Sequence, residues 1–198
     1  MAPRLRNIGG IVIGTSAGGI EALSVLLPAL PANLPASLFV VVHLPRDRPS
    51  LLVNIFKDRC ALPVREAEDK EPVVPGTVYF APPDYHLLLD AGPQLSLSAD
   101  DYVNFSRPSI DVLFESAADV YGERLLGIVL TGGNADGAAG LAAIQRAGGS
   151  TVVQDPGEAK APLMVTSALE KTQVDYVLPL NDIAALIRTL AVPAAKGN

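Results

Sequence analysis

Three continuous apolar runs are the clearest pattern in this chain, and they cover residues 8–14, 37–43 and 124–130. Such runs, bounded by glycine, proline and polar residues, are typical of strands that are buried on both faces, as in a parallel sheet. A helical period follows the first run at residues 18–27, and another precedes the third at residues 109–121. The alternation predicts an α/β fold with a doubly wound, mostly parallel sheet flanked by helices.

Residues 66–101 have a different texture. Short apolar runs there are separated by proline and glycine, and they cover residues 76–81, 86–89 and 95–97. Closely spaced short strands with turn signals between them predict a small antiparallel β insertion at the edge of the sheet.

The length and composition of the chain fit one domain with a sizeable core. Of its 198 residues 49% are hydrophobic, and no shift in composition divides the sequence. We therefore expect a single folded domain over residues 8–190, with flexible ends at residues 1–7 and 191–198. The 15 lysines and arginines against 21 acidic residues give a net charge of -6, which removes nucleic acid and anionic lipid as default partners.

No segment of the sequence is suited to span a membrane. The longest later apolar stretch, residues 22–44, is interrupted by Pro28, Pro31 and Pro35, so we expect no membrane insertion. Cys60 is the only cysteine, so an intrachain disulfide is excluded and nothing marks an oxidising compartment. The simplest expectation is a cytoplasmic protein.

A glycine-rich turn, Gly14-Thr15-Ser16-Ala17-Gly18, follows the first apolar run. Glycine permits a tight strand-to-helix turn, and the unpaired backbone N–H groups at a helix start can hold developing negative charge. Ser16 is therefore a candidate nucleophile. The same geometry suits a phosphate cradle, so a phosphate or nucleotide binder is a second interpretation of this turn.

Two further residues at strand ends supply what a serine nucleophile needs. His43 ends the run at residues 37–43, and Asp136 lies in a second glycine-rich turn after residues 124–130. An imidazole can accept the hydroxyl proton, and a carboxylate on its far ring nitrogen fixes the tautomer. Because the carboxyl ends of parallel strands meet at one edge of the sheet, we expect Ser16, His43 and Asp136 to converge on one crevice. Taken singly, each has a plainer explanation as a helix cap or a buried polar residue.

Several other motifs are excluded by the residues around Ser16. The spacing Gly14-x-Ser16-x-Gly18 matches the nucleophile elbow of α/β-hydrolases, but the order there is serine, acid, histidine, whereas the acid comes last here. The turn lacks the lysine of a P-loop, and His43 stands where a dinucleotide fold has an acidic ribose ligand. Two histidines and one cysteine at unrelated positions give no metal-ligand spacing, and we expect no cofactor.

A series of ordered motifs spans roughly residues 8–190. In chain order they are Gly14-Thr15-Ser16-Ala17-Gly18-Gly19, Val42-His43-Leu44, Tyr79-Phe80-Ala81-Pro82-Pro83-Asp84-Tyr85-His86, Ser106-Arg107-Pro108-Ser109-Ile110-Asp111-Val112-Leu113-Phe114, Leu130-Thr131-Gly132, Asp136-Gly137 and Val153-Gln154-Asp155. This series resembles the catalytic domain of the chemotaxis-receptor glutamate methylesterases, the CheB type. The resemblance implies that Ser16 is the nucleophile, His43 the base and Asp136 the acid. It further implies hydrolysis of glutamate γ-methyl esters on receptors, with deamidation of receptor glutamines as a second candidate activity.

The resemblance also implies candidates for the oxyanion hole and for substrate binding. Thr15, Ala17 and Gly133 are candidates at the two turns, and His86 and Arg107 are candidates near the substrate cleft. In the second turn Asn134 stands where the family usually has glycine, which affects the direction of the neighbouring backbone N–H groups.

The partners implied are the cytoplasmic helices of methyl-accepting chemoreceptors. Full-length members of the family carry an N-terminal receiver domain, and no such domain is expected within these 198 residues. The sequence is then either a fragment or a stand-alone protein that is regulated differently, and a separate regulatory receiver protein is a candidate partner. Arg46 and Arg48, in an otherwise acidic protein, are candidates to attract a glutamate-rich receptor helix. The alternative function is a non-catalytic binding module of the same fold, in which Asn134 disables the oxyanion hole.

Overall fold

The computed structural model describes residues 5, 7–44 and 50–191. Arg46 and Arg48 lie outside these residues, as do most of the expected flexible ends at 1–7 and 191–198. In the described part of the chain no helix is both long and apolar enough to cross a bilayer.

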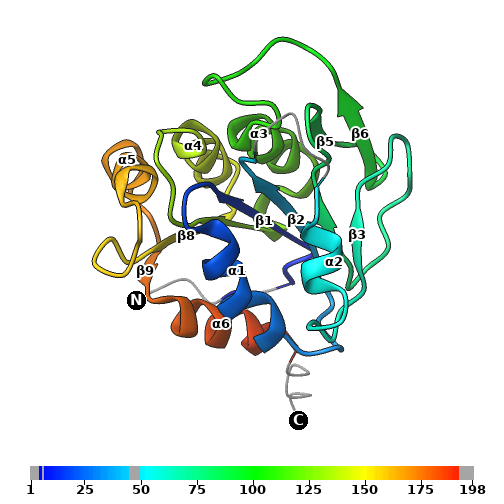
Figure 1. Cartoon of the computed structure of the whole chain (residues 1–198), viewed down its shortest axis with the longest axis horizontal. Coiled ribbons are helices and arrows are strands. Elements are labelled where there is room, and N and C mark those ends of the chain that lie inside the picture. Colours follow the sequence, from blue (N-terminus) through cyan, green and yellow to red (C-terminus); the bar gives the residue numbers. More distant parts are fainter. Residues whose placement is uncertain (1–4, 6, 45–49, 192–198) are drawn as a thin grey trace.

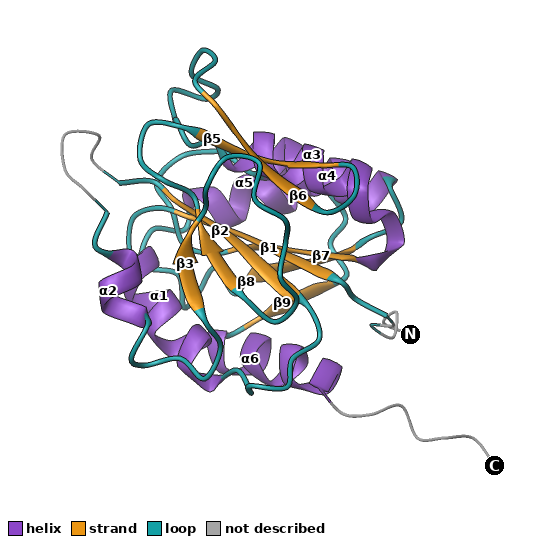
Figure 2. Cartoon of the chain, turned by 90° about the vertical axis from the view of Figure 1, so that its right-hand side faces the viewer, coloured by secondary structure: helices purple, strands orange, loops and turns teal. Residues whose placement is uncertain are grey.

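A parallel sheet of seven strands forms the centre of the molecule (Figures 1 and 2), with the order β3-β4-β2-β1-β7-β8-β9. Its strands are β1 (Gly10–Thr15), β2 (Ser37–Val42), β3 (Val64–Glu66), β4 (Val78–Phe80), β7 (Leu125–Val129), β8 (Ser150–Gln154) and β9 (Tyr176–Leu178). This order is doubly wound. Strands β2, β3 and β4 lie on one side of β1, and the chain then returns to the other side of β1, where β7, β8 and β9 follow in order. The predicted fold class is confirmed.

Six α-helices cover the two faces of the sheet in the described part of the chain (Figures 1 and 2). Those on one face are α1 (Gly19–Leu26), α2 (Leu52–Phe56) and α6 (Leu180–Arg188), and those on the other are α3 (Ile110–Tyr121), α4 (Ala138–Arg146) and α5 (Leu163–Lys171). Short 3₁₀ turns lie at Leu27–Ala29, Gly122–Arg124 and Thr189–Ala191.

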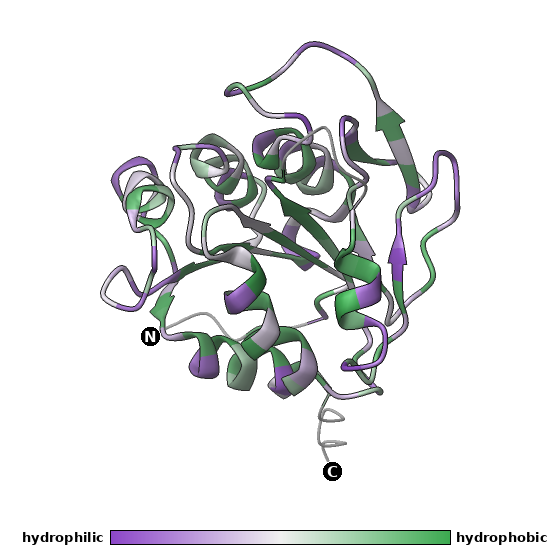
Figure 3. Cartoon of the chain, viewed as in Figure 1, coloured by the Kyte–Doolittle hydropathy of each residue, from purple (hydrophilic) through white to green (hydrophobic). Residues whose placement is uncertain are grey.

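Each face of the sheet packs against its helices as a separate apolar core. Successive side chains of a strand point to opposite faces, so Ile11 and Ile13 of β1 join one core while Val12 joins the other. The central strands β1, β2 and β7 are buried along their whole length, and most of their residues are hydrophobic (Figure 3). The strands that the continuous apolar runs predicted are therefore confirmed as β1, β2 and β7.

The insertion after β3 differs in one strand from the sequence-based expectation. β5 (His86–Asp90) and β6 (Gln94–Ser98) form the predicted antiparallel hairpin, which packs beside α3. Residues 76–81, however, contain β4, which pairs in parallel with both β2 and β3. Its residues Tyr79 and Phe80 are fully buried, and this two-sided burial is why β4 lies inside the parallel sheet.

The winding of the sheet places three turns at one edge. Ser16 follows β1, His43 follows β2, and Asp136 lies beyond β7. The chain reverses its direction of growth between β1 and β7, and ligand crevices of open α/β sheets lie outside the carboxyl ends of the strands at such a reversal.

Replacing Gly140 by alanine should destabilise the fold. A Cβ at Gly140 would lie 2.5 Å from the Cβ of Phe114 and 3.1 Å from the Cα of Asp111, so α4 must move away from α3. Overpacking costs about 1–3 kcal/mol, and alanine recovers about 1 kcal/mol of helix propensity. We expect the free energy of unfolding in urea to fall by up to about 2 kcal/mol.

The matched control is Gly133→Ala, because a Cβ there would meet no heavy atom within 4 Å. Its free energy of unfolding should equal that of the parent. An equal loss in both variants would contradict the close α3–α4 contact as the cause.

Candidate active site

The two glycine-rich turns are joined by a short series of hydrogen bonds. The Thr15 hydroxyl donates to the Thr131 carbonyl at 2.7 Å, and the Ser16 N–H donates to the same oxygen at 3.0 Å. The Thr131 hydroxyl donates in return to the Ala17 carbonyl at 2.9 Å. The turn that carries Ser16 is therefore fixed to the turn that leads to Asp136.

Asp136 is fully buried, and its carboxylate holds the first residues of α3. It accepts the Ile110 N–H at 2.7 Å, the Asp111 N–H at 3.1 Å and the Ser109 hydroxyl at 2.9 Å. Ser109 precedes the helix but makes no side-chain cap bond of its own. The unpaired N–H groups at the start of α3 are thus satisfied by a carboxylate from a distant turn.

The same carboxylate accepts from two further side chains. His43 Nε2 lies 2.9 Å from Asp136 Oδ2, and Asn104 Nδ2 donates to Asp136 Oδ1 at 2.9 Å. The structure thus brings together the predicted histidine and the predicted acid, and an acid in contact with the imidazole is what the chemistry requires.

Asp111 repeats this arrangement in the opposite direction. Its carboxylate accepts the Gly137 N–H at 3.0 Å and the Gly140 N–H at 2.6 Å, at the start of α4. Asn104 Nδ2 also donates to Asp111 at 2.8 Å, so one amide group joins the two carboxylates. α3 and α4 therefore cap each other.

The two carboxylates have pKa values that are shifted in opposite directions. Burial alone would raise the pKa of Asp136, but hydrogen bonds from His43, then from the Ile110 N–H and from Asn104, outweigh it and leave the pKa below its ordinary value. Burial raises the pKa of Asp111, and the nearby charge of Asp136 adds to the rise against the opposing bonds from Gly140, Asn104 and Gly137. The lowered pKa keeps the Asp136 carboxylate ionised at neutral pH.

His43 lies beside Ser16 with one ring nitrogen directed toward the acid. Its backbone N–H donates to the Thr15 carbonyl at 3.1 Å, which continues the pairing of β1 with β2 past the strand ends. Because the ionised Asp136 carboxylate can only accept, Nε2 carries the hydrogen and Nδ1 keeps a lone pair. Asn134 Nδ2 lies 3.3 Å from this Nδ1.

Ser16 is half-buried, and its hydroxyl has no hydrogen-bond partner among the described residues. In its turn, the Ser16 and Gly19 N–H groups already donate to the Thr131 and Ser16 carbonyls. A phosphate cradle needs several converging free N–H groups, so these bonds weigh against the phosphate-binding interpretation of this turn.

The candidates for the oxyanion hole fall into two groups. Thr15 is fully buried, and its hydroxyl is used in the contact with Thr131. Ala17 and Gly133 are exposed, and neither N–H donates to a backbone carbonyl in the described part of the chain. Backbone N–H groups at Ala17 and Gly133 therefore remain open to a ligand.

His86 and Arg107 hold a loop in place. Both ring nitrogens of His86 are occupied, since Nδ1 accepts the Ser109 N–H at 3.1 Å and Nε2 lies 3.0 Å from the Asp101 carbonyl. Arg107 donates to Asp84 at 2.8 Å and to backbone carbonyls of residues 99–100, and it stacks on a tyrosine ring of the same loop. Both side chains therefore position residues 99–107.

This loop carries the residues that the sequence did not single out. Asn104 and Phe105 both have left-handed backbone conformations, with φ of 51° and 60°. The Asn104 side chain points into the site and donates to Asp111 and Asp136, while the neighbouring residue Phe105 is 96% exposed. No periodicity or spacing marks Asn104, because its partners come from α3 and from the second glycine turn.

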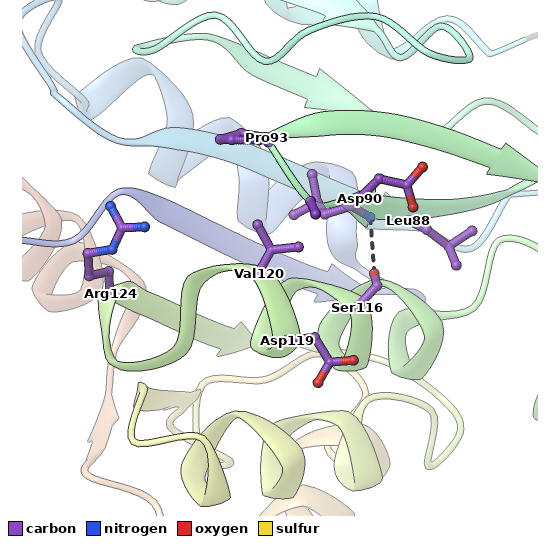
Figure 4. Close-up of a pocket in the computed structure, with 10 residues that line it drawn as sticks. Leu88, Asp90, Pro93, Ser116, Asp119, Val120 and Arg124 are labelled. Atoms are coloured by element: carbon purple, nitrogen blue, oxygen red, sulfur yellow. Dashed lines mark hydrogen bonds between the residues drawn. The ribbon is translucent and has the colours of Figure 1, made fainter.

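A hollow of about 560 Å³ lies elsewhere, between the β5–β6 turn and α3 (Figure 4). Asp90, Asp119 and Arg124 line it, and the Ser116 hydroxyl there accepts the Leu89 N–H at 3.2 Å. None of its lining residues belongs to the two glycine turns. Within residues 5, 7–44 and 50–191, no group of three or more His, Cys, Asp and Glu side chains is arranged to hold a metal ion.

Comparisons with known proteins agree on one family. The family described as CheB methylesterase matches residues 11–187. A relative from Leptospira interrogans is 48% identical over 180 residues, which cover 91% of this chain and 93% of the relative, and its name assigns it provisionally as a protein-glutamate methylesterase/protein-glutamine glutaminase. A relative from Symbiobacterium thermophilum with the same name, given without that reservation, is 40% identical, and the match covers 89% of this chain and 49% of the relative.

A solved structure gives the same result for the fold. The crystal structure of the Thermotoga maritima CheB methylesterase catalytic domain matches with a TM-score of 0.88 and 36% identity, covering 92% of this chain and 98% of that one. The fold and the relatives define the class of protein as a hydrolase built on a doubly wound α/β sheet. Within that class, the chain belongs to the CheB methylesterase family.

Replacing Asp136 by asparagine should cost both stability and reactivity. The NH₂ group of asparagine can only donate, so it would face N–H and O–H groups that now donate to the carboxylate. Breaking a buried charged interaction in this way costs about 3–5 kcal/mol. Loss of the correct imidazole tautomer lowers the rate of a serine hydrolase by about 10⁴-fold. Urea unfolding and labelling by a fluorophosphonate measure the two effects.

The stability difference should depend on pH with a definite sign. A lowered pKa in the folded state stabilises the fold above the ordinary carboxyl pKa of about 3.9, and this contribution is lost as the pH falls through the folded value. The difference in free energy of unfolding between the parent and Asp136→Asn should therefore become smaller as the pH is lowered. Asp119→Asn, at an exposed position of α3, should match the parent in both measurements.

Proposed function

We propose that this protein is a serine carboxyl-ester hydrolase that removes methyl groups from glutamate γ-methyl esters of chemoreceptors, with residues 8–190 as its catalytic domain. The observation that carries the proposal is the 2.9 Å contact between His43 Nε2 and Asp136 Oδ2, beside Ser16. Membership of the CheB methylesterase family supports the ester substrate. It also favours a catalytic role over a non-catalytic binding module.

The proposed reaction begins with attack of Ser16 Oγ on the γ-carbonyl carbon of the ester. The hydroxyl proton passes to His43 Nδ1, and the ionised Asp136 stabilises the imidazolium that forms. The carbonyl oxygen becomes an oxyanion, for which the open N–H groups of Ala17 and Gly133 are the candidate donors.

Collapse of the tetrahedral intermediate breaks the bond to the methoxy oxygen. The leaving methoxide takes the proton from His43 and departs as methanol, and the substrate remains as a glutamyl ester of Ser16. A water molecule then gives a proton to His43 and attacks this ester. The second collapse returns the proton from His43 to Ser16 and releases the glutamate carboxyl group, which loses its remaining proton to the solvent. With a glutamine side chain as substrate, ammonia would leave in place of methanol, which is the second candidate activity.

Removing the Ser16 hydroxyl should abolish the reaction at little cost to the fold. Since Ser16 Oγ has no partner among the described residues, Ser16→Ala should unfold at the same temperature as the parent. Methanol release from methylated receptor should fall to the residual level that binding and an oxyanion hole supply, about 10³ to 10⁴-fold above water. Ser24→Ala, on α1, serves as the control and should retain full activity. Methanol release by Ser16→Ala at the parent rate would refute the mechanism.

The braced loop at residues 99–107 supports the proposed partner, the cytoplasmic helices of chemoreceptors. Its exposed Phe105 projects next to Asn104, which bonds directly to Asp136. Exposed aromatic side chains on a preorganised element are favoured at contact surfaces, because little conformational freedom is lost on binding. We propose that Phe105 contacts the apolar side of the receptor helix that carries the ester. A separate receiver protein is the candidate regulator of this activity.

Phe105→Ala should weaken receptor binding without changing the chemistry. Loss of one aromatic anchor costs about 1–2 kcal/mol, which corresponds to a KM for methylated receptor raised about 5- to 30-fold. The rate of fluorophosphonate labelling should stay at the parent value, because that small probe reacts with Ser16 without contacting Phe105. Val177→Ala, an exposed apolar position on the edge strand β9, should leave both quantities unchanged.

A further inference from the structure

The side-chain amide of Asn134 occupies the ring nitrogen of His43 on which the proposed function depends. Asn134 Nδ2 lies 3.3 Å from His43 Nδ1, on the opposite side of the ring from Asp136. Nδ1 is the atom that must accept the proton of Ser16. At rest, its lone pair is therefore directed at an amide N–H, while the Ser16 hydroxyl has no partner among the described residues.

The orientation of this amide is fixed by its own turn. Asn134 Oδ1 accepts the Asp136 N–H at 3.1 Å, a side-chain-to-backbone bond of the kind that stabilises Asx turns. The oxygen is thus committed to the turn, and the NH₂ group faces the imidazole. Since that group can only donate, its contact with Nδ1 is one of donor to lone pair.

Asn134 is not needed to select the tautomer of His43. The Asp136 carboxylate, at 2.9 Å and ionised, already requires the hydrogen to be on Nε2, and a charge-assisted hydrogen bond is stronger than one from a neutral amide at 3.3 Å. The remaining effect of the amide is competition with Ser16 for the lone pair. A neutral hydrogen bond of this kind changes an equilibrium by about two- to tenfold.

We propose that Asn134 is a positioning residue that acts through His43: it holds the base in a resting state and must move away before Ser16 can be deprotonated. This inference rests on the proposed function, because it requires that Ser16 and His43 form the reacting pair. It gives the turn at residues 131–137 a control role, in addition to its role in supplying Asp136.

Fluorophosphonate labelling of Ser16 tests the proposal with two variants. Asn134→Ala removes the whole side chain, whereas Asn134→Ser keeps an oxygen that can accept the Asp136 N–H but is too short to reach His43. Both variants should be labelled about two- to tenfold faster than the parent at alkaline pH. A merely structural role predicts no acceleration, so an unchanged or slower rate in both variants would overturn the proposal.

Nitrogen NMR of the imidazoles provides a second readout that does not depend on turnover. The chain has only two histidines, so the spectrum is simple, and His86 serves as an internal reference because its ring nitrogens are bonded to Ser109 and Asp101. In Asn134→Ser the Nδ1 resonance of His43 should move while Nε2 stays protonated and His86 is unchanged. An unmoved Nδ1 resonance would contradict the contact itself.

The labelling experiment also separates failure of this inference from failure of the proposed function. If the parent is not labelled, or if Ser16→Ala is labelled equally well, the assignment of the nucleophile fails. If the parent is labelled at Ser16 but neither Asn134 variant is faster, only the resting-state role of Asn134 fails.

Discussion

The buried carboxylate of Asp136 is the interaction on which both the fold and the site depend. An unpaired buried charge would be prohibitively unfavourable, and here it is compensated by donors from α3, from the braced loop and from His43. These donors come from segments far apart in the sequence. A single charge therefore ties the start of α3, the loop at residues 99–107 and the histidine turn to one point.

Asp111 makes the arrangement reciprocal, since each carboxylate caps the helix that begins beside the other. Burial raises the pKa of Asp111 and the charge of Asp136 adds to the rise, whereas hydrogen bonds, led by the one from His43, hold the pKa of Asp136 below its ordinary value. The amide of Asn104 lies between them and donates to both. Its bond to Asp136 is one of several that lower the pKa of that carboxylate and so keep it ionised, which is the state that a histidine base needs in its partner.

The sequence was sufficient to predict the central strands β1, β2 and β7 and the candidate residues that follow them. Ser16, His43 and Asp136 could be singled out because each follows a continuous apolar run, and parallel winding brings the ends of such runs to one edge. Residues 76–81, which contain β4, were expected in the antiparallel insertion, because a short run between proline and glycine signals does not show which sheet it joins. Local patterns cannot reveal partners that only the fold brings together.

That limit applies most strongly to capping. Ser109 has the residue type and the position of a helix cap, yet its hydroxyl donates to Asp136, and the N–H groups of the helix are satisfied by the same distant carboxylate. Asp111, in the first turn of α3, would be interpreted from sequence as a favourable charge near the helix dipole. Its backbone partners are the N–H groups of Gly137 and Gly140, at the start of α4.

The site therefore divides into a fixed part and a part that can change partners. Asp136 has all its acceptor positions occupied by the fold, so it cannot move without disturbing α3. Among the described residues, Ser16 forms hydrogen bonds through its backbone alone, and His43 Nδ1 has Asn134 as its one, neutral, partner. A proton transfer needs a base whose orientation is fixed on one side and whose lone pair can be exchanged on the other. The unequal bonding of the two ring nitrogens of His43 meets both requirements.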